Sequence, residues 1–394
     1  MRGNTATFRH QWCNTRGELS LLVTTTRSEL LIALNACTVL SRDEICTFAK
    51  HLESWQTSAE ASTTLSDSLG VHRESLEKAL AVRDAAATAA QREARRCDEA
   101  GIRLLTWHDD AYPIKLLDLE LPPPVLYCRG RIPRRPAIAI VGSRRADAYG
   151  IAVAETFAAD LAAKGMTVVS GLALGVDSSA HRSALDQEHG TSVAVLGCGI
   201  DVHYPHGSGR LQERLAAHGA VVSEFPLGTA PLARNFPIRN RIIAALAASC
   251  LVIQAAHRSG SLITARLALN LGRDVYAIPG RIFDRYSKGT NSLIRDGAFL
   301  VTHPRDILDT LPLEAKESLA EQASSQANEE PPEGDSRQLL RIFELGESHS
   351  ADRLAATLEA PIEKVLEMLM DLELGGWIRR APGALYRLRS TSMG

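Results

Sequence analysis

The sequence lacks paired cysteines, long apolar runs and a marked excess of charge of either sign. Its seven cysteines are an odd number, are spread over 394 residues and form no Cys-x-x-Cys pair. This argues against a disulfide framework and against a zinc site. No apolar run approaches the roughly 20 residues that cross a bilayer, and the first residues lack the order of a signal peptide. We therefore expect a cytoplasmic protein with no metal and no membrane partner.

The charge balance is nearly even over the whole chain but differs between its parts. The formal net charge is −2, and 45% apolar with 23% charged residues is ordinary for a globular protein. Between Arg134 and Thr310 there are 19 Lys and Arg against 14 Asp and Glu, a difference of +5, whereas Glu314 to Asp335 holds 1 basic and 7 acidic residues. A polyanionic partner is therefore expected at the middle of the chain.

The N-terminal part of the chain is predicted to be helical. After an irregular segment over residues 1–27, leucines recur at three- and four-residue intervals over residues 28–100, which predicts a small helical domain. Residues 101–135 contain a short strand over 101–106 and the run Leu121-Pro-Pro-Pro-Val-Leu-Tyr, which cannot be helical. We interpret residues 101–135 as a connector.

From residue 136 the pattern changes to short, continuous apolar runs separated by amphipathic helices. Such runs are typical of strands buried on both faces of a parallel sheet. The predicted strands are Ala137–Val141, Thr167–Ser170, Ser192–Leu196, Ala220–Ser223, Cys250–Gln254 and Asp274–Ala277, with Phe299–Val301 as a seventh candidate, and the helices include Ala152–Ala163 and Ser261–Leu271. The fold class is therefore α/β, a Rossmann-like doubly wound, mostly parallel sheet over residues 136–312. In such sheets, ligands bind at the C-terminal edge of the strands.

The C-terminal part combines a linker with a second small domain. Residues 313–335 are acidic, polar and proline-containing, which predicts a flexible linker. Over residues 336–394, a hairpin pattern follows three helical patterns, Ser336–Leu345, Ala351–Leu358 and Pro361–Leu374, and together they predict a winged helix. The third helix carries Glu363, Glu367, Asp371 and Glu373 against the single Lys364. Because this face would repel phosphates, a protein-interaction or regulatory role is favoured for this domain.

Glycine and serine residues follow several predicted strands at the edge where ligands are expected. They are Gly142, Ser143 and Arg144 after the first strand, Ser170 and Gly171 at the end of the second, and Gly260 and Ser261 after the fifth. Free backbone N–H groups at such turns and helix N-termini bind phosphates. Ordinary strand-to-helix turns and helix caps are the alternative interpretation.

The segment from Phe236 to Arg241 reads Phe-Pro-Ile-Arg-Asn-Arg and sets an aromatic ring beside Arg239 and Arg241, with Arg234 just upstream. Guanidinium groups fit phosphate oxygens bidentately, and a ring can stack on an unpaired base. A core position for Phe236 with solvated arginines is the other interpretation. The combination favours a single-stranded nucleic acid as the ligand.

The sequence contains no clear catalytic or cofactor-binding pattern. Gly197-Cys-Gly-Ile-Asp follows the third strand but lacks the third glycine of the dinucleotide fingerprint. Asp177 and His181 lie four residues apart without a nucleophile, which is more typical of a structural hydrogen bond than of a catalytic pair. Asp201 and Glu224 lie at strand ends, where they also suit turn or backbone pairing. We expect no cofactor and no enzymatic activity.

Taken together, these motifs resemble the DNA-processing protein A family (DprA, also called Smf). The resemblance covers residues from about 101 to 310 and rests on seven motifs in order: Val141-Gly-Ser-Arg, Ser170-Gly-Leu-Ala-x-Gly-Val-Asp-x-x-Ala-His, Leu196-Gly-x-Gly-Ile-Asp-Val-x-Tyr-Pro, Ser223-Glu-x-Pro, Phe236-Pro-x-Arg-Asn-Arg, Ser259-Gly-Ser-Leu-Ile-Thr-Ala and Gly289-x-Asn-x-Leu-Ile-x-x-Gly-Ala. Seven motifs at plausible spacing make the resemblance specific.

The resemblance implies a single-stranded DNA binding protein, not an enzyme, that protects incoming DNA in natural transformation and loads RecA recombinase onto it. It implies a helical domain of the sterile-alpha-motif type before the core, a winged helix after it, and a homodimer formed through the Rossmann-like domain. It places DNA phosphates at Gly142, Ser143 and Arg144, and a base against Phe236. Arg239 and Arg241 match the family's paired arginines. For the dimer surface we expect Leu293, Ile294 and Leu300.

Three positions depart from the family pattern. Leu174 stands where members often carry a basic or polar residue, Ser208 replaces a common asparagine, and Gln254 replaces a frequent glutamate. Arg145, Arg210 and Arg258 are the candidates that would compensate for the missing cation.

Two functions of other classes stay open on the sequence. A phosphoribohydrolase of the lysine-decarboxylase-like type shares the Rossmann-like sheet, but Ser259-Gly-Ser-Leu-Ile-Thr stands in place of its Pro-Gly-Gly-x-Gly-Thr signature. A regulator that binds duplex DNA through the winged helix is disfavoured by the acidic third helix.

Overall fold

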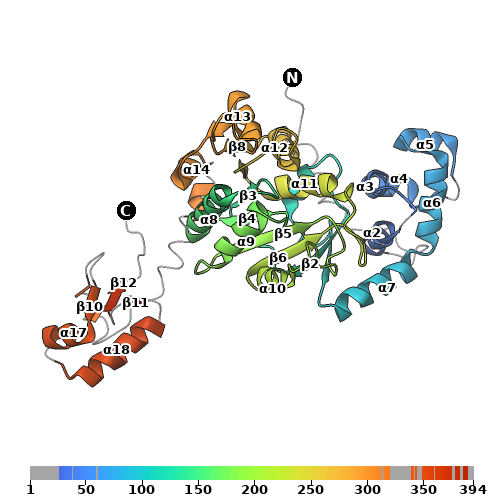
Figure 1. Cartoon of the computed structure of the whole chain (residues 1–394). Coiled ribbons are helices and arrows are strands. Elements are labelled where there is room, and N and C mark those ends of the chain that lie inside the picture. Colours follow the sequence, from blue (N-terminus) through green and yellow to red (C-terminus); the bar gives the residue numbers. More distant parts are fainter. Residues whose placement is uncertain are drawn as a thin grey trace. The chain divides into compact units, whose positions relative to one another are not determined.

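The computed structural model describes most of the chain. Described are residues 26–37, 39–58, 61–311, 313, 315–319, 339–340, 342–343, 348–358, 360–374, 378–381 and 385–388. The chain divides into two units, Met1–Ala320 and Glu321–Gly394, which we describe separately (Figure 1). Of the predicted irregular segment 1–27, only residues 26 and 27 are described. Of the predicted flexible linker 313–335, residues 313 and 315–319 are described; they are helical, and Ala315 and Leu319 pack partly against the core. In the part of the chain that is described, none of the helices combines the length and apolarity needed to cross a membrane.

A nine-stranded sheet forms the centre of the first unit, counted over its described residues, with the order β1-β2-β6-β5-β4-β3-β7-β8-β9. Its strands are β1 Arg103–Thr106, β2 Val125–Gly130, β3 Ala137–Val141, β4 Thr167–Ser170, β5 Thr191–Leu196, β6 Gly219–Ser223, β7 Ser249–Val252, β8 Asp274–Ala277 and β9 Phe299–Leu300. Across the sheet from β6 to β9, every pair of neighbouring strands is parallel. The predicted doubly wound, mostly parallel sheet is confirmed.

Residues 101–135, interpreted from the sequence as a connector, are part of the sheet. Strands β1 and β2 pair antiparallel with each other, and β2 pairs antiparallel with β6. The intervening prolines exclude helix but leave β2 free to pair, because Pro122 to Pro124 end just before the strand begins. Between the two strands, the short 3-10 helix η1 (Ile114–Asp118) contributes the buried Leu116 to the core.

Helices cover both faces of the sheet because its central strands are apolar on both faces. Ile138 and Ile140 of β3 pack with α8 (Ala148–Ala163), α9 (Val176–Leu185) and α14 (Pro304–Thr310), whereas Ala139 and Val141 pack with α11 (Asn235–Leu246) and α12 (Gly260–Asn270). Figure 1 shows these two helix layers on opposite sides of the strands. The predicted helices Ala152–Ala163 and Ser261–Leu271 are α8 and α12. The remaining helices of this region are α10 (Gly209–His218) and α13 (Lys288–Arg295).

The N-terminal region is helical, as the leucine spacing predicts. Its helices are α2 Arg27–Ala36, α3 Arg42–Lys50, α4 Leu52–Trp55, α5 Thr63–Leu69, α6 Arg73–Asp84 and α7 Ala86–Glu99. Capping boxes begin two of them: Thr26 with Glu29 on α2, and Ser41 with Glu44 on α3. Helices α2 and α7 pack together and both contact β1, so this region lies against the edge of the sheet formed by β1 and β2.

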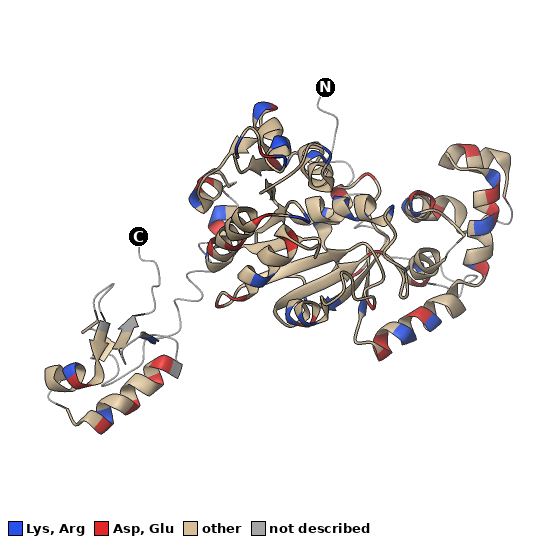
Figure 2. Ribbon diagram, viewed as in Figure 1, with Lys and Arg blue, Asp and Glu red and all other residues tan. Residues whose placement is uncertain are grey.

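The second unit contains the predicted winged helix. Its described elements are β10 Ser348–Ser350, α17 Ala351–Leu358, α18 Ile362–Leu374, β11 Ile378–Ala381 and β12 Leu385–Leu388. The predicted hairpin is formed by β11 and β12, which pair antiparallel, and β10 adds a third strand by pairing with β12. The first predicted helix, Ser336–Leu345, lies mostly outside the described residues. On α18, Glu363, Glu367 and Asp371 are exposed, and Figure 2 shows the acidic residues along this helix.

Candidate functional site

The topology of the sheet identifies one place where loops diverge. From β3 the chain runs outward through β4, β5 and β6, then returns to β7 on the other side of β3 and continues through β8 to β9. The connections that follow β3 and β7 therefore leave the sheet in opposite directions. This is a topological switch point, the position where open α/β sheets bind ligands.

A pocket of about 600 Å³ opens at this switch point. Its walls come from the turn after β3, from the N-terminal part of α11 and from the N-terminus of α12. Seven of the ten predicted site residues line it, namely Gly142, Ser143, Arg144, Phe236, Arg239, Gly260 and Ser261. The volume lies within the range of pockets that hold small ligands.

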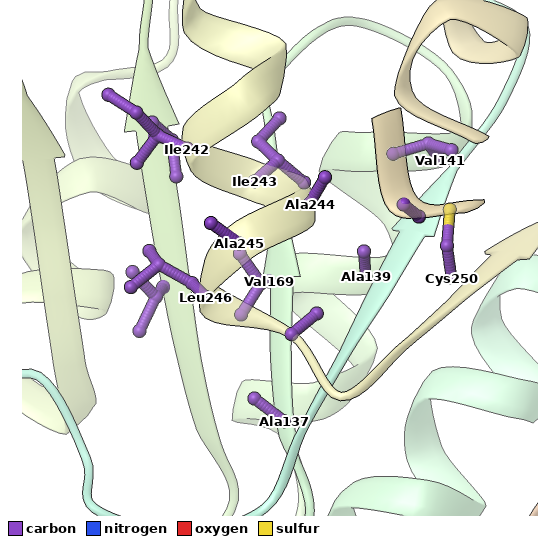
Figure 3. Packing of buried hydrophobic residues seen from close by; sticks show 14 of the residues in the cluster. Ala137, Ala139, Val141, Val169, Ile242, Ile243, Ala244, Ala245, Leu246 and Cys250 are labelled. Carbon is purple, nitrogen blue, oxygen red and sulfur yellow. The ribbon is translucent and has the colours of Figure 1, made fainter. Parts of the chain in front are cut away.

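Helix α11 brings the Phe236 segment to this pocket. Figure 3 shows the apolar side chains from Ile242 to Leu246 against residues of β3 and β4, and all of them belong to one buried cluster. Because the C-terminal turns of α11 are fixed on the sheet, its first turns lie at the strands' C-terminal edge. Phe236, Arg239, Asn240 and Ile243 follow the i, i+3, i+4, i+7 spacing of one helix face, and all four line the pocket.

Phe236 forms an aromatic wall of the pocket. Its half-buried ring lies 5.5 Å from the ring of Tyr204, centroid to centroid, at an interplanar angle of 37°. The guanidinium carbon of Arg144 lies 5.0 Å from the Phe236 ring centroid, within the range of a cation–π contact. A Cβ on Gly197 would lie 2.8 Å from Phe236 Cδ1, so only glycine fits beneath the ring. Phe236 is therefore neither a core residue nor fully exposed.

Arg144 is a cation of this pocket that is available to bind an anion. It is exposed, and within the described residues it has no ion pair with a carboxylate. Arg145 also lines the pocket and is exposed, whereas Arg210 and Arg258, the other candidates to compensate for Leu174, are exposed outside its lining. The turn that carries both arginines is held by the backbone N–H of Arg145, which donates to Ser143 Oγ at 3.1 Å.

Arg239 is a buried brace beneath the pocket and not a solvated cation. Only 3% of the residue is exposed, and its Nη1 donates to the carbonyl oxygens of Gly171, at 2.8 Å, and Val195. Burial lowers the pKa of the Arg239 guanidinium to about 10, an effect that the nearby Asp177 carboxylate opposes. A Cβ on Gly171 would lie 2.6 Å from two guanidinium nitrogens, so glycine at 171 makes room for Arg239. The prediction of a direct phosphate contact for Arg239 therefore gains no support from its geometry.

Asp177 and His181 do not form the hydrogen-bonded pair that their spacing favours. Asp177 Oδ2 accepts from the backbone N–H groups of Gly171 and Ala173, at 3.2 and 3.4 Å. His181 Nδ1, on α9, lies 2.7 Å from the hydroxyl of Ser192 on strand β5. Burial raises the pKa of the Asp177 carboxyl and lowers the pKa of His181 to about 3, so the imidazole is neutral. Asp177 therefore holds the backbone of the loop after β4, and His181 ties α9 to strand β5.

Arg241 lies outside the pocket, on a different side of α11. It donates to both carboxylate oxygens of Glu224, at 3.1 and 2.7 Å, with side chains that are 14% and 1% exposed. The N-terminal helices close over this ion pair: Asn35 Nδ2 donates to the Glu224 carbonyl at 3.0 Å, and Arg42 reaches the same oxygen. The proposed role of Arg241 as a DNA ligand is therefore disfavoured, because its guanidinium is used inside the protein.

The remaining predicted residues divide between the pocket and the core. Ser170 is fully buried, and its hydroxyl donates to the Ile140 carbonyl at 2.6 Å, so it holds β4 to β3 and does not reach the pocket. Gly171 lines a smaller adjoining cavity of about 60 Å³, which shares Arg144 and Phe236 with the larger one. Gly260 and Ser261 form the first turn of α12, where the side chain of Ser259 caps the Ser261 N–H.

The three departures from the family pattern have different surroundings. Leu174 is exposed beside the smaller cavity. Ser208 is buried, where its hydroxyl accepts from Gln212 Nε2 at 3.2 Å. Gln254 Nε2 donates to Asp147 Oδ1 at 2.9 Å, and this carboxylate caps α8. An amide at position 254 thus avoids a second carboxylate beside Asp147.

Sequence reasoning missed several residues of the pocket. Tyr204, Asn240, Thr264 and Tyr286 line it without having been predicted. Asn240 was recoverable from its helical spacing to Phe236. Tyr204 follows β5 in a quoted motif, but nothing in the sequence shows that its loop crosses to the ring of Phe236.

Comparisons with known proteins agree with the geometry. A family model described as DNA recombination-mediator protein A matches residues 103–312, and a DprA winged helix domain model matches residues 323–384. Protein Smf of Escherichia coli K12 is 40% identical over 297 residues, which span 73% of this chain and 77% of that protein. DNA processing protein DprA of Streptococcus pneumoniae R6 is 43% identical over 202 residues, which span 51% of this chain and 71% of that protein.

The fold has a matching relative among solved structures. The X-ray structure of DprA from Streptococcus pneumoniae superposes with a TM-score of 0.63 at 32% sequence identity, over 73% of this chain and 99% of that one. The family resemblance of the seven motifs is thereby confirmed, and the chain belongs to the DprA (Smf) family of DNA recombination-mediator proteins.

Proposed function

We propose that the switch-point pocket binds single-stranded DNA, and that the protein protects incoming DNA in natural transformation and loads RecA recombinase onto it. The observation that carries the proposal is the juxtaposition of Arg144, Phe236 and Tyr204 beside the turn after β3 and the N-terminus of α12. Family membership supports the same function.

The parts of the pocket match the chemistry of one unpaired nucleotide. Backbone N–H groups at the turn of Gly142 and at the start of α12, together with the Arg144 guanidinium, suit phosphate oxygens. The Phe236 ring offers a face on which a base can stack. In a duplex the base faces are already covered by neighbouring bases, so an aromatic wall favours a single strand.

The carboxylates at this edge of the sheet already have partners. Asp177 accepts from backbone N–H groups, Glu224 pairs with Arg241, and both oxygens of Asp201 lie 2.9 Å from the Gly228 N–H that donates to them. This arrangement favours binding without covalent chemistry. We therefore propose no hydrolase activity, and no observation favours the phosphoribohydrolase alternative.

We further propose that two copies associate through the edge strand β9. Phe299 and Leu300 are 49% and 53% exposed there, on a strand with an unpaired edge among the described residues. Leu293, expected at the same surface, packs partly against the core beside α12, so its share in the contact would be small. Two sites in one dimer would hold a long strand by avidity.

For the winged-helix unit we propose contact with a protein and not with duplex DNA. The exposed acidic residues of α18 would repel phosphates, and between them Leu366 and Met370 are exposed as well. Apolar side chains surrounded by charge are typical of protein interfaces. RecA is the partner that the family's function suggests.

Replacing Arg144 with alanine is expected to lower the affinity for oligo(dT) roughly 10- to 100-fold, because a charge-assisted contact to phosphate is lost. The slope of the logarithm of the binding constant against the logarithm of the salt concentration should become less negative by about 0.7, the value for one lost phosphate contact. Fluorescence anisotropy with labelled oligo(dT), and matched duplex as competitor, measures both. Arg305→Ala is the control, since this arginine is 80% exposed on α14, on the other face of the sheet.

Equal affinity of the Arg144→Ala variant and the wild type would contradict a phosphate site at this turn. A wild type that prefers the duplex competitor would contradict the single-strand assignment as a whole.

A further inference from the structure

The loop between β8 and α13 carries the two most exposed large apolar side chains in the described part of the chain. Phe283 is 92% exposed and Ile282 is 75% exposed. Neither has a role in the pocket. Adjacent exposed apolar side chains rimmed by polar residues are typical of interaction sites.

This loop is held in one shape. Asp284 Oδ1 accepts from the Tyr286 N–H at 3.0 Å, and Asp284 Oδ2 accepts from the Ser287 hydroxyl at 2.7 Å. The Asp284 N–H donates to the Arg281 carbonyl at 3.0 Å. At the start of the loop, Asn291 binds both the N–H and the carbonyl of Gly280, at 3.1 and 3.0 Å. The loop therefore presents Phe283 outward as a fixed turn.

The same loop forms part of the pocket rim. Tyr286 lines the pocket, and its carbonyl accepts from the Ala255 N–H at 2.7 Å, next to the pocket residue Ala256. The guanidinium carbon of Arg285 lies 5.0 Å from the Tyr286 ring centroid. A ligand that leaves the pocket on the Tyr286 side would meet this loop.

The charge of the loop suits an anion. Arg281, Arg285 and Lys288 are exposed and form no ion pair within the described residues. The one carboxylate among them, Asp284, is used to hold the turn. An exposed aromatic ring flanked by cations is the arrangement with which proteins bind single strands without sequence preference.

We propose that this loop is a second contact for single-stranded nucleic acid. A strand that extends from the pocket past Tyr286 stacks a base on Phe283 and places phosphates near Arg281, Arg285 and Lys288. The inference rests on the proposed function of the pocket. It adds the path that the bound nucleic acid takes when it leaves the pocket. A strand confined to the pocket would not reach Phe283.

Strand length separates this loop from the pocket in an experiment. Affinities are measured by anisotropy for oligo(dT) of about 4 and about 20 nucleotides, the shorter filling a small site only. Phe283→Ala and Phe283→Leu should weaken binding of the long strand on the order of 5- to 100-fold and leave the short strand unchanged. Phe283→Tyr, which keeps a stacking face, should bind both strands as the wild type does. Arg144→Ala should weaken both.

Three results would overturn the inference. The first is wild-type affinity of Phe283→Ala for the long strand while Arg144→Ala still weakens it, which leaves the pocket assignment intact. The second is wild-type affinity of Phe283→Leu, which would indicate an apolar contact and not stacking. The third is a change of oligomeric state in Phe283→Ala, measured by light scattering without DNA, which would assign the loop to a second copy of the chain. Because Phe283 is exposed, none of these variants is expected to change the thermal unfolding midpoint.

Discussion

Replacing Arg239 with alanine is expected to lower the free energy of unfolding by about 2–5 kcal/mol, so this variant should fail to bind DNA mainly because its pocket is no longer held. The substitution leaves the carbonyls of Gly171 and Val195 without their donor. It also removes the stronger of the two cations, Arg239 and Arg144, that stabilise the buried Asp177 carboxylate. Urea denaturation followed by circular dichroism measures the change.

Arg234→Ala is the matched control, because Arg234 is exposed just before the same helix and should have a free energy of unfolding within about 0.5 kcal/mol of the wild type. If Arg239→Ala is as stable as the wild type but no longer binds DNA, the structural role of Arg239 is contradicted. Arg239 would then be a direct phosphate ligand.

Replacing Arg241 with methionine is expected to cost about 3–5 kcal/mol of stability, because Glu224 is then a buried carboxylate without its partner. Replacing both residues with apolar ones, Arg241→Met with Glu224→Leu, should recover most of this loss, since an apolar pair of similar volume avoids burying charge. The Glu224 backbone contacts with Asn35 and Arg42 do not depend on its side chain. Thermal and urea unfolding of Arg241→Met, of Glu224→Leu and of the double variant measure the coupling energy between the two side chains.

The double variant also separates structure from binding. If Arg241 acts only inside the protein, the folded double variant should bind oligo(dT) with the affinity of the wild type. A stable double variant with lost affinity would show that the Arg241 guanidinium meets DNA after all.

The contrast between the two arginines also shows where sequence reasoning reached its limit. Both lie in one motif, and the sequence alone suggested that they act together. On a helix, however, residues two apart point in different directions. Arg239 therefore turns towards the sheet beneath Phe236, while Arg241 turns towards Glu224 and the N-terminal helices. The six-residue pattern is too short to show that it begins a helix.

The sheet was predictable because its strands are buried on both faces. Runs such as Ala137–Val141 are apolar throughout, and such runs distinguish parallel strands from half-exposed ones. Strand β2 escaped prediction because its run follows three prolines, which indicate a loop more strongly than Val125–Gly130 indicates a strand. Strand β10 has three residues, too few to form a pattern.

The rim of the pocket was predictable for a topological reason. In a doubly wound sheet every strand-to-helix turn reaches the same edge, so Gly142, Gly260 and Phe236 could be assigned to one place without knowing their distances. Tyr204 and Tyr286 could not, because their positions depend on how two loops fold back over the rim. The loop of Phe283 was missed for the same reason.

The most direct test of the pocket assignment is hydrogen–deuterium exchange of the full chain with and without saturating oligo(dT). Bound strand should slow exchange at the backbone amides of residues 142–145, 235–241 and 259–264, because these line the pocket and would donate to or be covered by the ligand. Unchanged exchange at these three segments, with protection confined to residues 348–388 of the winged-helix unit, would contradict a single-strand site at the switch point.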